Sequence, residues 1–161
     1  MARLYTCKGD LGYTDMANGK RVLKDDSMIE IIGTLDEFSS MLGVAKVHTK
    51  DEALILDIEN LQNMTVSVMA ELSGYKAFVT EETVKNVEEM IDKYGIGFSG
   101  LTLPGKTKAS AFLDIARTIV RRAERIATKA FRKKKISKPL MCLLNRISDL
   151  AYAMGQYAGR E

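Results

Sequence analysis

Apolar residues recur at steps of three and four between residues 28 and 45, which places them on one face of a helix. This spacing predicts a helix whose apolar side packs against a core. The apolar positions are Met28, Ile31, Ile32, Leu35, Phe38, Leu42 and Ala45.

Four further segments have the helical pattern. We expect helices over residues 54–72, about 80–94, about 108–132 and about 138–159, with a glycine-rich loop at 95–105. No segment shows a convincing strand pattern of alternating apolar and polar residues. The sequence therefore predicts an all-α protein, a bundle of five helices.

The first 27 residues differ from the rest of the chain. Gly9, Gly12 and Gly19 lie among polar residues such as Asp10 and Asn18, without an apolar period. This composition is typical of a loop. A loop of this length in a compact domain is usually functional or disordered. We expect one domain over residues 1–161, with a loop segment at 1–27 and the bundle at 28–161.

Length and charge exclude several classes of protein. A chain of 161 residues with 46% hydrophobic residues is long enough for one packed domain. The net charge of +3 does not by itself imply a nucleic-acid partner. The N-terminus lacks the apolar run of a signal peptide, and no apolar stretch is long enough to span a membrane. We expect a cytoplasmic protein whose two cysteines, Cys7 and Cys142, are free thiols.

The fourth predicted helix contains ARTIVRRAER at residues 116–125. At about 100° per residue, its alanine and isoleucine residues gather on one side. The opposite side carries a charged stripe within about 80°. Its members are Arg117, Arg121, Glu124 and Arg125, with Arg122 off the edge.

Two interpretations of this stripe are open. Like charges four residues apart repel one another, so the stripe costs stability unless an anion lies against it. Guanidinium groups match phosphate oxygens with paired hydrogen bonds, which favours a triphosphate or another polyanion. The alternative is a solvated surface, partly neutralised by Glu124.

The N-terminal glycines provide a second candidate phosphate site. Glycine lets backbone N–H groups approach an anion closely. However, YTCKGDLGYT is not the phosphate-binding loop of nucleotide hydrolases, and no strand precedes it. Taken alone, GDLG is better explained as a turn. The presence of both features in one small chain favours a nucleotide ligand.

Several motifs resemble those of one known family. YTCKGDLGYT, GKRVLKDD and GTLDEFSSMLGVA, followed by LTLPG, ARTIVRRAER and LNRISDL, resemble the motifs of PduO-type ATP:cob(I)alamin adenosyltransferases. Their order and spacing agree from Tyr5 to about Leu150, which is nearly the whole chain. RRAER followed by NRISD is a specific combination.

The resemblance implies a fold, an assembly and a reaction. The family is a five-helix bundle that assembles as a homotrimer with active sites between subunits. It transfers the 5′-deoxyadenosyl group of ATP to the cobalt of cob(I)alamin, which gives adenosylcobalamin and triphosphate, with Mg²⁺ accompanying the nucleotide. A cob(II)alamin reductase and a B12-dependent enzyme that receives the product are the implied partners. A nucleic-acid or membrane partner is not implied.

The resemblance also implies roles for individual residues. Asp36 and Arg117 match a pair that forms a salt bridge between subunits beside the corrinoid. Arg121 and Arg125 are expected to stabilise charge on the departing triphosphate. The positions that match ATP-binding residues are Thr6, Cys7, Lys8, Gly9, Asp10, Thr14, Asp15, Lys24, Arg122, Glu124 and Asn145.

Three positions depart from the family pattern. Leu101 replaces a phenylalanine that packs under the corrin and helps to displace the lower axial ligand, so we expect weaker displacement, or displacement by another residue such as Phe98. Cys7 and Lys8 replace a basic residue followed by a hydroxyl residue. Asp114 stands where many members have histidine.

Two other functions remain open on these residues. The Leu101 departure motivates a relative that holds ATP or adenosylcobalamin without turnover, for delivery or sensing. The basic run at residues 129–138 allows an RNA-binding protein, although a helix C-terminus also favours cations. The RNA hypothesis leaves the N-terminal loop and the charged stripe unexplained.

Overall fold

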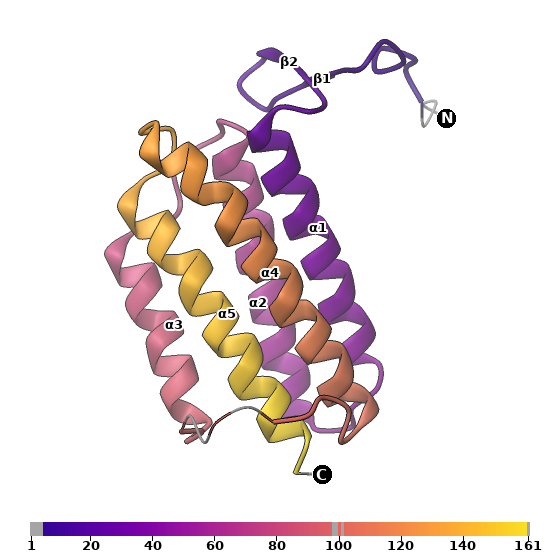
Figure 1. Ribbon diagram of the computed structural model, residues 1–161, viewed down its shortest axis with the longest axis vertical. Coiled ribbons are helices and arrows are strands. Elements are labelled where there is room, and N and C mark those ends of the chain that lie inside the picture. The colour runs from indigo at the N-terminus through magenta and orange to yellow at the C-terminus, as the bar shows by residue number, and fades with distance from the viewer. Residues whose placement is uncertain (1–4, 98–99, 101, 161) are drawn as a thin grey trace.

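The computed structural model describes residues 5–97, 100 and 102–160. Within these residues the chain forms five helices and one small hairpin (Figure 1). The elements are β1 (Tyr13–Asp15), β2 (Arg21–Leu23), α1 (Ser27–Lys46), α2 (Glu52–Leu72), α3 (Glu81–Lys93), α4 (Lys108–Arg132) and α5 (Lys138–Ala158). The predicted five-helix, all-α architecture is confirmed.

The helices run up and down alongside one another (Figure 1). α4 packs closely against both α1 and α5, α2 lies against α1, and α3 lies against α5. Their shared core is apolar and includes the fully buried side chains of Phe38, Leu61, Leu113 and Leu143. α4 presents alanines to this core, which lets its neighbours approach closely.

Side chains that bond the first free N–H groups fix where the helices begin. Asp26 accepts a hydrogen bond from the Met28 amide and starts α1. Thr107 and Ser110 bond each other's backbone amides at the start of α4. Ser137 caps α5, whose second residue is a proline, a residue suited to the first turn of a helix.

The predicted loop at residues 1–27 contains a hairpin, so the prediction that no strand is present was wrong here. β1 and β2 pair antiparallel, with Thr14 opposite Val22. Gly19 has a φ of 79° in the connecting turn, where glycine carries no steric penalty. Three residues per strand are too few to produce a recognisable alternation.

No helix among the described residues has the length and apolar character needed to cross a membrane. The basic run begins in the last turn of α4, and Lys133 caps that helix. This position agrees with the interpretation as cations at a helix C-terminus.

Candidate functional site

The charged stripe of α4 faces away from the core, as its spacing predicts. Ala116, Ala123 and Ala127 are buried on the inner side. Arg121 and Arg125 are exposed on the outer side. Arg121 and Arg125 are separated by one turn, about 6 Å along the axis at 1.5 Å per residue, so a single extended anion can contact both.

Arg117 has an acidic partner on its own helix. Its Nε donates to Asp114 Oδ1 at 3.5 Å, and both side chains are largely shielded from solvent. Asp114 is the position that departs from the family's histidine. A carboxylate one turn before Arg117 offsets part of its charge and restricts its side chain.

The predicted pair between Asp36 and Arg117 is not present within one chain. Asp36 is exposed on α1, where it lines a shallow cleft with Gly33, Ser40 and Ile119. Arg117 lines a different cleft, on the α5 side of α4. Within one chain these two residues therefore lie in separate clefts.

Arg122 is directed towards α1, where it forms an ion pair with Glu37. Both side chains are about half exposed, at 48% and 59%. This pair links α4 to α1 and separates Arg122 from the Arg121–Arg125 side of the helix. Sequence spacing placed Arg122 off the edge of the stripe but did not identify its partner.

A cleft of about 200 Å³ lies between α4, α5 and two residues of the loop before α4, Gly100 and Thr102. Arg117 and Arg121 form its cationic side. Asp114, noted from the sequence as a departure from the family pattern, also lines the cleft. The members that sequence reasoning missed are Ser148, Asp149 and Tyr152 of α5.

Asn145 lies one turn before Asp149 on α5 and is held by its neighbour. Its Oδ1 accepts a hydrogen bond from Arg146 Nη1 at 2.8 Å. Arg146 also donates to Glu88 of α3 at 2.7 Å, and this bond raises the pKa of the guanidinium above its ordinary value. Asn145 is thus oriented by an arginine that is itself fixed.

The N-terminal segment is folded by contacts with itself. Arg21 pairs with Asp15 at 3.0 Å and donates to the Lys8 carbonyl oxygen. The Lys24 ammonium lies 3.1 Å from where a Cβ on Gly9 would stand. Glycine at position 9 therefore leaves room for a cation beside the loop backbone. The structure brings the predicted residues Gly9 and Lys24 together.

The other predicted residues of this segment are open to solvent. Thr14 is half-buried, and the rest are exposed: Thr6, Cys7, Lys8, Asp10 and Asp15. Cys7 is a free thiol, as is Cys142. Cys7 has a φ of 58°, an uncommon conformation for a residue with a side chain.

Residues 5–24, which the family resemblance assigns to ATP (the nucleotide segment), lie apart from the α4 stripe within one chain. The hairpin and the residues before it extend beyond the end of the bundle (Figure 1). For the residues described, the hydrogen bonds of this segment run to itself and to the end of α2. The predicted corrinoid residues Phe98 and Leu101 lie outside the described residues.

Protein side chains alone do not form a metal cage in the described part of the chain. No group of three or more histidine, cysteine, aspartate or glutamate residues there is arranged to hold a metal ion. Mg²⁺ commonly binds through substrate phosphates with one or two carboxylates. Glu124, half-buried on the stripe, is a carboxylate beside Arg121 and Arg125 on α4.

A family model described as cobalamin adenosyltransferase matches residues 4–158. The chain belongs to this family. It is 35% identical to a corrinoid adenosyltransferase of Citrobacter freundii, over 97% of this chain and 94% of that protein. It is 34% identical to a corrinoid adenosyltransferase of Bacillus subtilis, over 94% of this chain and 83% of that protein.

Solved structures of the family share the fold. A variant of the PduO-type ATP:corrinoid adenosyltransferase from Lactobacillus reuteri, in complex with cobalamin and ATP, superimposes with a TM-score of 0.89 at 28% identity. The match covers 98% of this chain and 94% of that one. Membership of the adenosyltransferase family therefore rests on sequence and on fold together.

Proposed function

We propose that this chain transfers the 5′-deoxyadenosyl group of ATP to the cobalt of cob(I)alamin, giving adenosylcobalamin and triphosphate. The observation that carries the proposal is the exposed Arg121–Arg125 face of α4. It adjoins a cleft that also holds Arg117 and the 95–107 segment. In this adenosyltransferase family, such a face suits the triphosphate of the substrate nucleotide.

The reaction requires little covalent chemistry from the protein. An electron pair on cobalt(I) attacks C5′ of ATP, the cobalt–carbon bond forms, and the C5′–O bond breaks. Triphosphate leaves with the electrons of that bond. Because cob(I)alamin is already a strong nucleophile, the protein needs to align C5′ with cobalt and stabilise the leaving group. Arg121 and Arg125 supply positive charge where the triphosphate charge develops.

A homotrimer with sites between subunits completes this arrangement. Two pairs of predicted site features that lie apart within one chain support it. The nucleotide segment lies beyond the end of the bundle, and Asp36 and Arg117 line different clefts. A neighbouring subunit brings its N-terminal segment to the α4 stripe and its Asp36 to Arg117. Oligomers commonly build sites this way when each subunit carries one half.

The proposal also includes a metal ion, two partner enzymes and a cellular location. Mg²⁺ enters with the nucleotide, held mainly by phosphate oxygens and assisted by Glu124. A cob(II)alamin reductase supplies the cobalt(I) state, and a B12-dependent enzyme receives the product. A cytoplasmic location fits the two free cysteines, since reduced thiols persist there.

An anaerobic spectral assay tests the reaction. The purified protein is mixed with ATP, Mg²⁺ and chemically reduced cobalamin, and the light-sensitive alkylcobalt spectrum is followed. We expect that spectrum only when ATP is present. Arg121→Ala should lower kcat/KM by about 10²- to 10³-fold, the usual cost of losing one donor to transition-state charge. Arg132→Ala is the matched control, because Arg132 is an exposed arginine at the far end of the same helix.

A non-catalytic relative is the second candidate, and Leu101 is the residue that favours it. This alternative predicts tight binding of adenosylcobalamin or ATP without turnover, even when cob(I)alamin is supplied directly. Turnover by the unmodified chain eliminates it.

A further inference from the structure

We propose that α2, which contributes no residue to the Arg117–Arg121 cleft or to the Asp36 cleft, positions both substrate-binding segments through its two ends. Its C-terminal end holds the nucleotide segment, and its N-terminal end fixes Tyr94, from which the chain leads to Gly100 and Thr102 on the corrinoid side of the proposed site. The inference rests on the proposed function. In Figure 1 the hairpin lies at one end of the bundle and the end of α3 and the start of α4 lie at the other, and α2 runs between these two ends.

At the C-terminal end of α2, Ser73 caps the helix and receives the hairpin turn. The Ala17 amide donates to Ser73 Oγ at 2.7 Å, and the Asn18 amide reaches the Ser73 carbonyl at 3.4 Å. Gly74 follows with a φ of 85°, and a Cβ there would overlap the Asn18 side chain. The hairpin turn is thus seated on the cap of α2.

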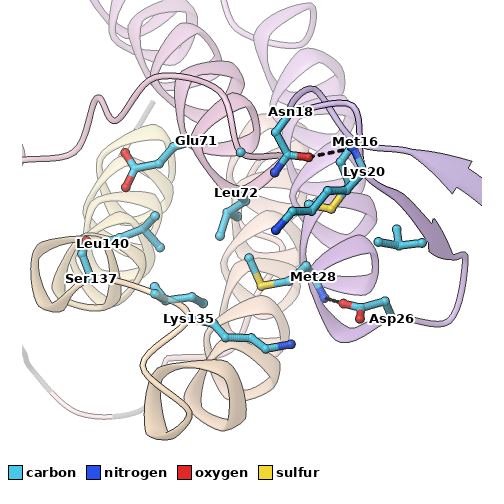
Figure 2. A pocket seen from close by; sticks show the side chains of 13 residues that line it. Met16, Asn18, Lys20, Asp26, Met28, Glu71, Leu72, Lys135, Ser137 and Leu140 are labelled. Atoms are coloured by element: carbon cyan, nitrogen blue, oxygen red, sulfur yellow. Dashed lines mark hydrogen bonds between the residues drawn. The ribbon is translucent and has the colours of Figure 1, made fainter.

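Little else ties this turn to the bundle. A cleft of about 410 Å³ separates the hairpin from the bundle. Figure 2 shows Asn18 and Lys20 of the hairpin on one side of this cleft, and Ser137 and Leu140 of the α5 start on the other. Among the described residues, the hydrogen bonds from the hairpin turn to the bundle both end on Ser73, so we expect these contacts to contribute most to the position of the turn.

The seated turn sets the position of predicted ATP-binding residues. β1 leads from the turn back to Thr14, and β2 leads on to Lys24. The Lys24 amide donates to the Gly12 carbonyl at 2.8 Å. This hydrogen bond extends the hairpin pairing to the glycine-containing loop before β1. Loss of the Ser73 contact should therefore misplace the loop without unfolding the helices.

At the N-terminal end of α2, a buried carboxylate holds the end of α3. Asp57 is 6% exposed and accepts hydrogen bonds from Lys93 Nζ and from the Tyr94 hydroxyl, both at 2.8 Å. Burial and the bond to Asp57 raise the pKa of Tyr94, so its hydroxyl stays a donor. A buried carboxylate requires such partners, because leaving it unpaired is costly.

This contact joins two helices that are otherwise apart. Among the described residues, the backbone of α3 approaches that of α5 but not that of α2. Tyr94 also packs edge-on against Tyr157 of α5, with ring centres 5.3 Å apart. The end of α3 is therefore fixed from two directions.

The 95–107 segment starts from this fixed point. Gly95 has a φ of 58° and turns the chain directly after Tyr94. Farther along, Thr102 Oγ1 lies 3.0 Å from Gln156 Nε2 of α5 and accepts its hydrogen bond. Gly100 and Thr102 both line the cleft with Arg117 and Arg121. The Asp57–Tyr94 bond thus fixes the point from which the chain continues towards Gly100 and Thr102.

The test separates the two ends by the KM of each substrate. Ser73→Ala should raise the KM for ATP about 3- to 10-fold, the effect of one lost hydrogen bond, and leave the KM for cob(I)alamin within about 2-fold. Tyr94→Phe should raise the KM for cob(I)alamin by a similar factor and leave the KM for ATP within about 2-fold. Ser73→Thr, which keeps the hydroxyl, should restore the KM for ATP. In both variants kcat should change less than the affected KM.

Thr65→Val is the matched control. Thr65 is buried in the middle of α2 and bonds only its own helix, at Leu61 O. Thr65→Val should lower thermal stability and leave both KM values unchanged. The inference is overturned if Ser73→Ala and Tyr94→Phe each change both KM values equally, or if neither variant changes either KM. Turnover by the wild type would still uphold the proposed function in that case. Absence of turnover and of ATP binding in the wild type overturns both.

Discussion

The helical bundle and the N-terminal segment are held by different kinds of interaction. The bundle buries aliphatic and aromatic side chains from all five helices. In residues 5–24, only Gly9, Thr14, Met16 and Val22 are even half-buried, and hydrogen bonds hold the fold of the segment. Apolar burial gives the bundle stability of its own, whereas the segment has little apolar burial and depends on hydrogen bonds.

The largest effect is expected from a cavity in the bundle. Phe38 is fully buried in α1. Phe38→Ala should lower the free energy of unfolding by about 3–5 kcal/mol, through lost burial and a residual cavity. Urea unfolding followed by circular dichroism measures this. A loss below about 1 kcal/mol would show that α1 is not part of the main core.

A change in the N-terminal segment should act on the nucleotide alone. Lys24→Ala removes a cation beside Gly9 and should weaken ATP binding by about 10- to 100-fold, the range for a charged hydrogen bond. The unfolding transition should stay unchanged, because Lys24 is exposed. Calorimetric titration with ATP and Mg²⁺ measures the affinity. The exposed Lys20→Ala serves as the control, and equal losses in both variants would argue against a specific role.

The Leu101 departure gives a third prediction. The family resemblance implies that an aromatic ring at this position helps to displace the lower ligand of cobalamin. Leu101→Phe should therefore raise the fraction of four-coordinate cob(II)alamin in the ATP complex, measured by its absorption or magnetic spectra. A wild-type protein that already shows the full four-coordinate population would contradict this prediction.

Acid should weaken the end of the bundle at which α2 begins. The Leu54 amide and the Tyr157 hydroxyl hold the pKa of Asp51 below its usual value of 3.8. The unfolded chain therefore takes up the proton first as the pH falls. The contribution of Asp51 is full above about pH 5 and is lost towards the lowered pKa. Asparagine also caps helices, so Asp51→Asn should keep the cap and reduce the fall of the urea midpoint between pH 6 and pH 2.5.

The smallest effect is expected at the Arg122–Glu37 pair. Both side chains are half exposed, and pairs of this kind contribute about 0–1 kcal/mol. Glu37→Gln should change the free energy of unfolding by less than about 1 kcal/mol, and added salt should remove the difference. A loss of several kcal/mol would mean that this pair is buried in the assembled protein.

The helices could be predicted from sequence because their apolar period extends over many residues. The predicted range 108–132 coincides with α4, and 138–159 exceeds α5 by one residue. The hairpin could not be predicted, since its strands have three residues each and its stability comes from the turn and from Ser73.

Sequence spacing identified one side of the site and missed the other. The rotation of α4 follows from its own alanines, so the outward direction of Arg121 and Arg125 was predictable. Ser148, Asp149 and Tyr152 enter the cleft because of how α5 packs beside α4, and no local pattern encodes that packing. The same reason explains why Glu37 of α1 was not predicted as the partner of Arg122, whereas the partner of Arg117, Asp114, lies three residues earlier on the same helix.

Mixed oligomers test most directly whether the α4 stripe and the nucleotide segment meet across a subunit boundary. Arg121→Ala and Lys24→Ala chains, each weakly active alone, are co-expressed with different tags, and oligomers that carry both tags are purified. Sites with both halves intact then form, so adenosylcobalamin formation should rise well above that of either variant. As the control, each single variant is mixed with the chain that carries both substitutions, because no site with both halves intact can form in such oligomers. Activity no higher than that of the separate variants, in oligomers shown to contain both chains, would contradict the shared site.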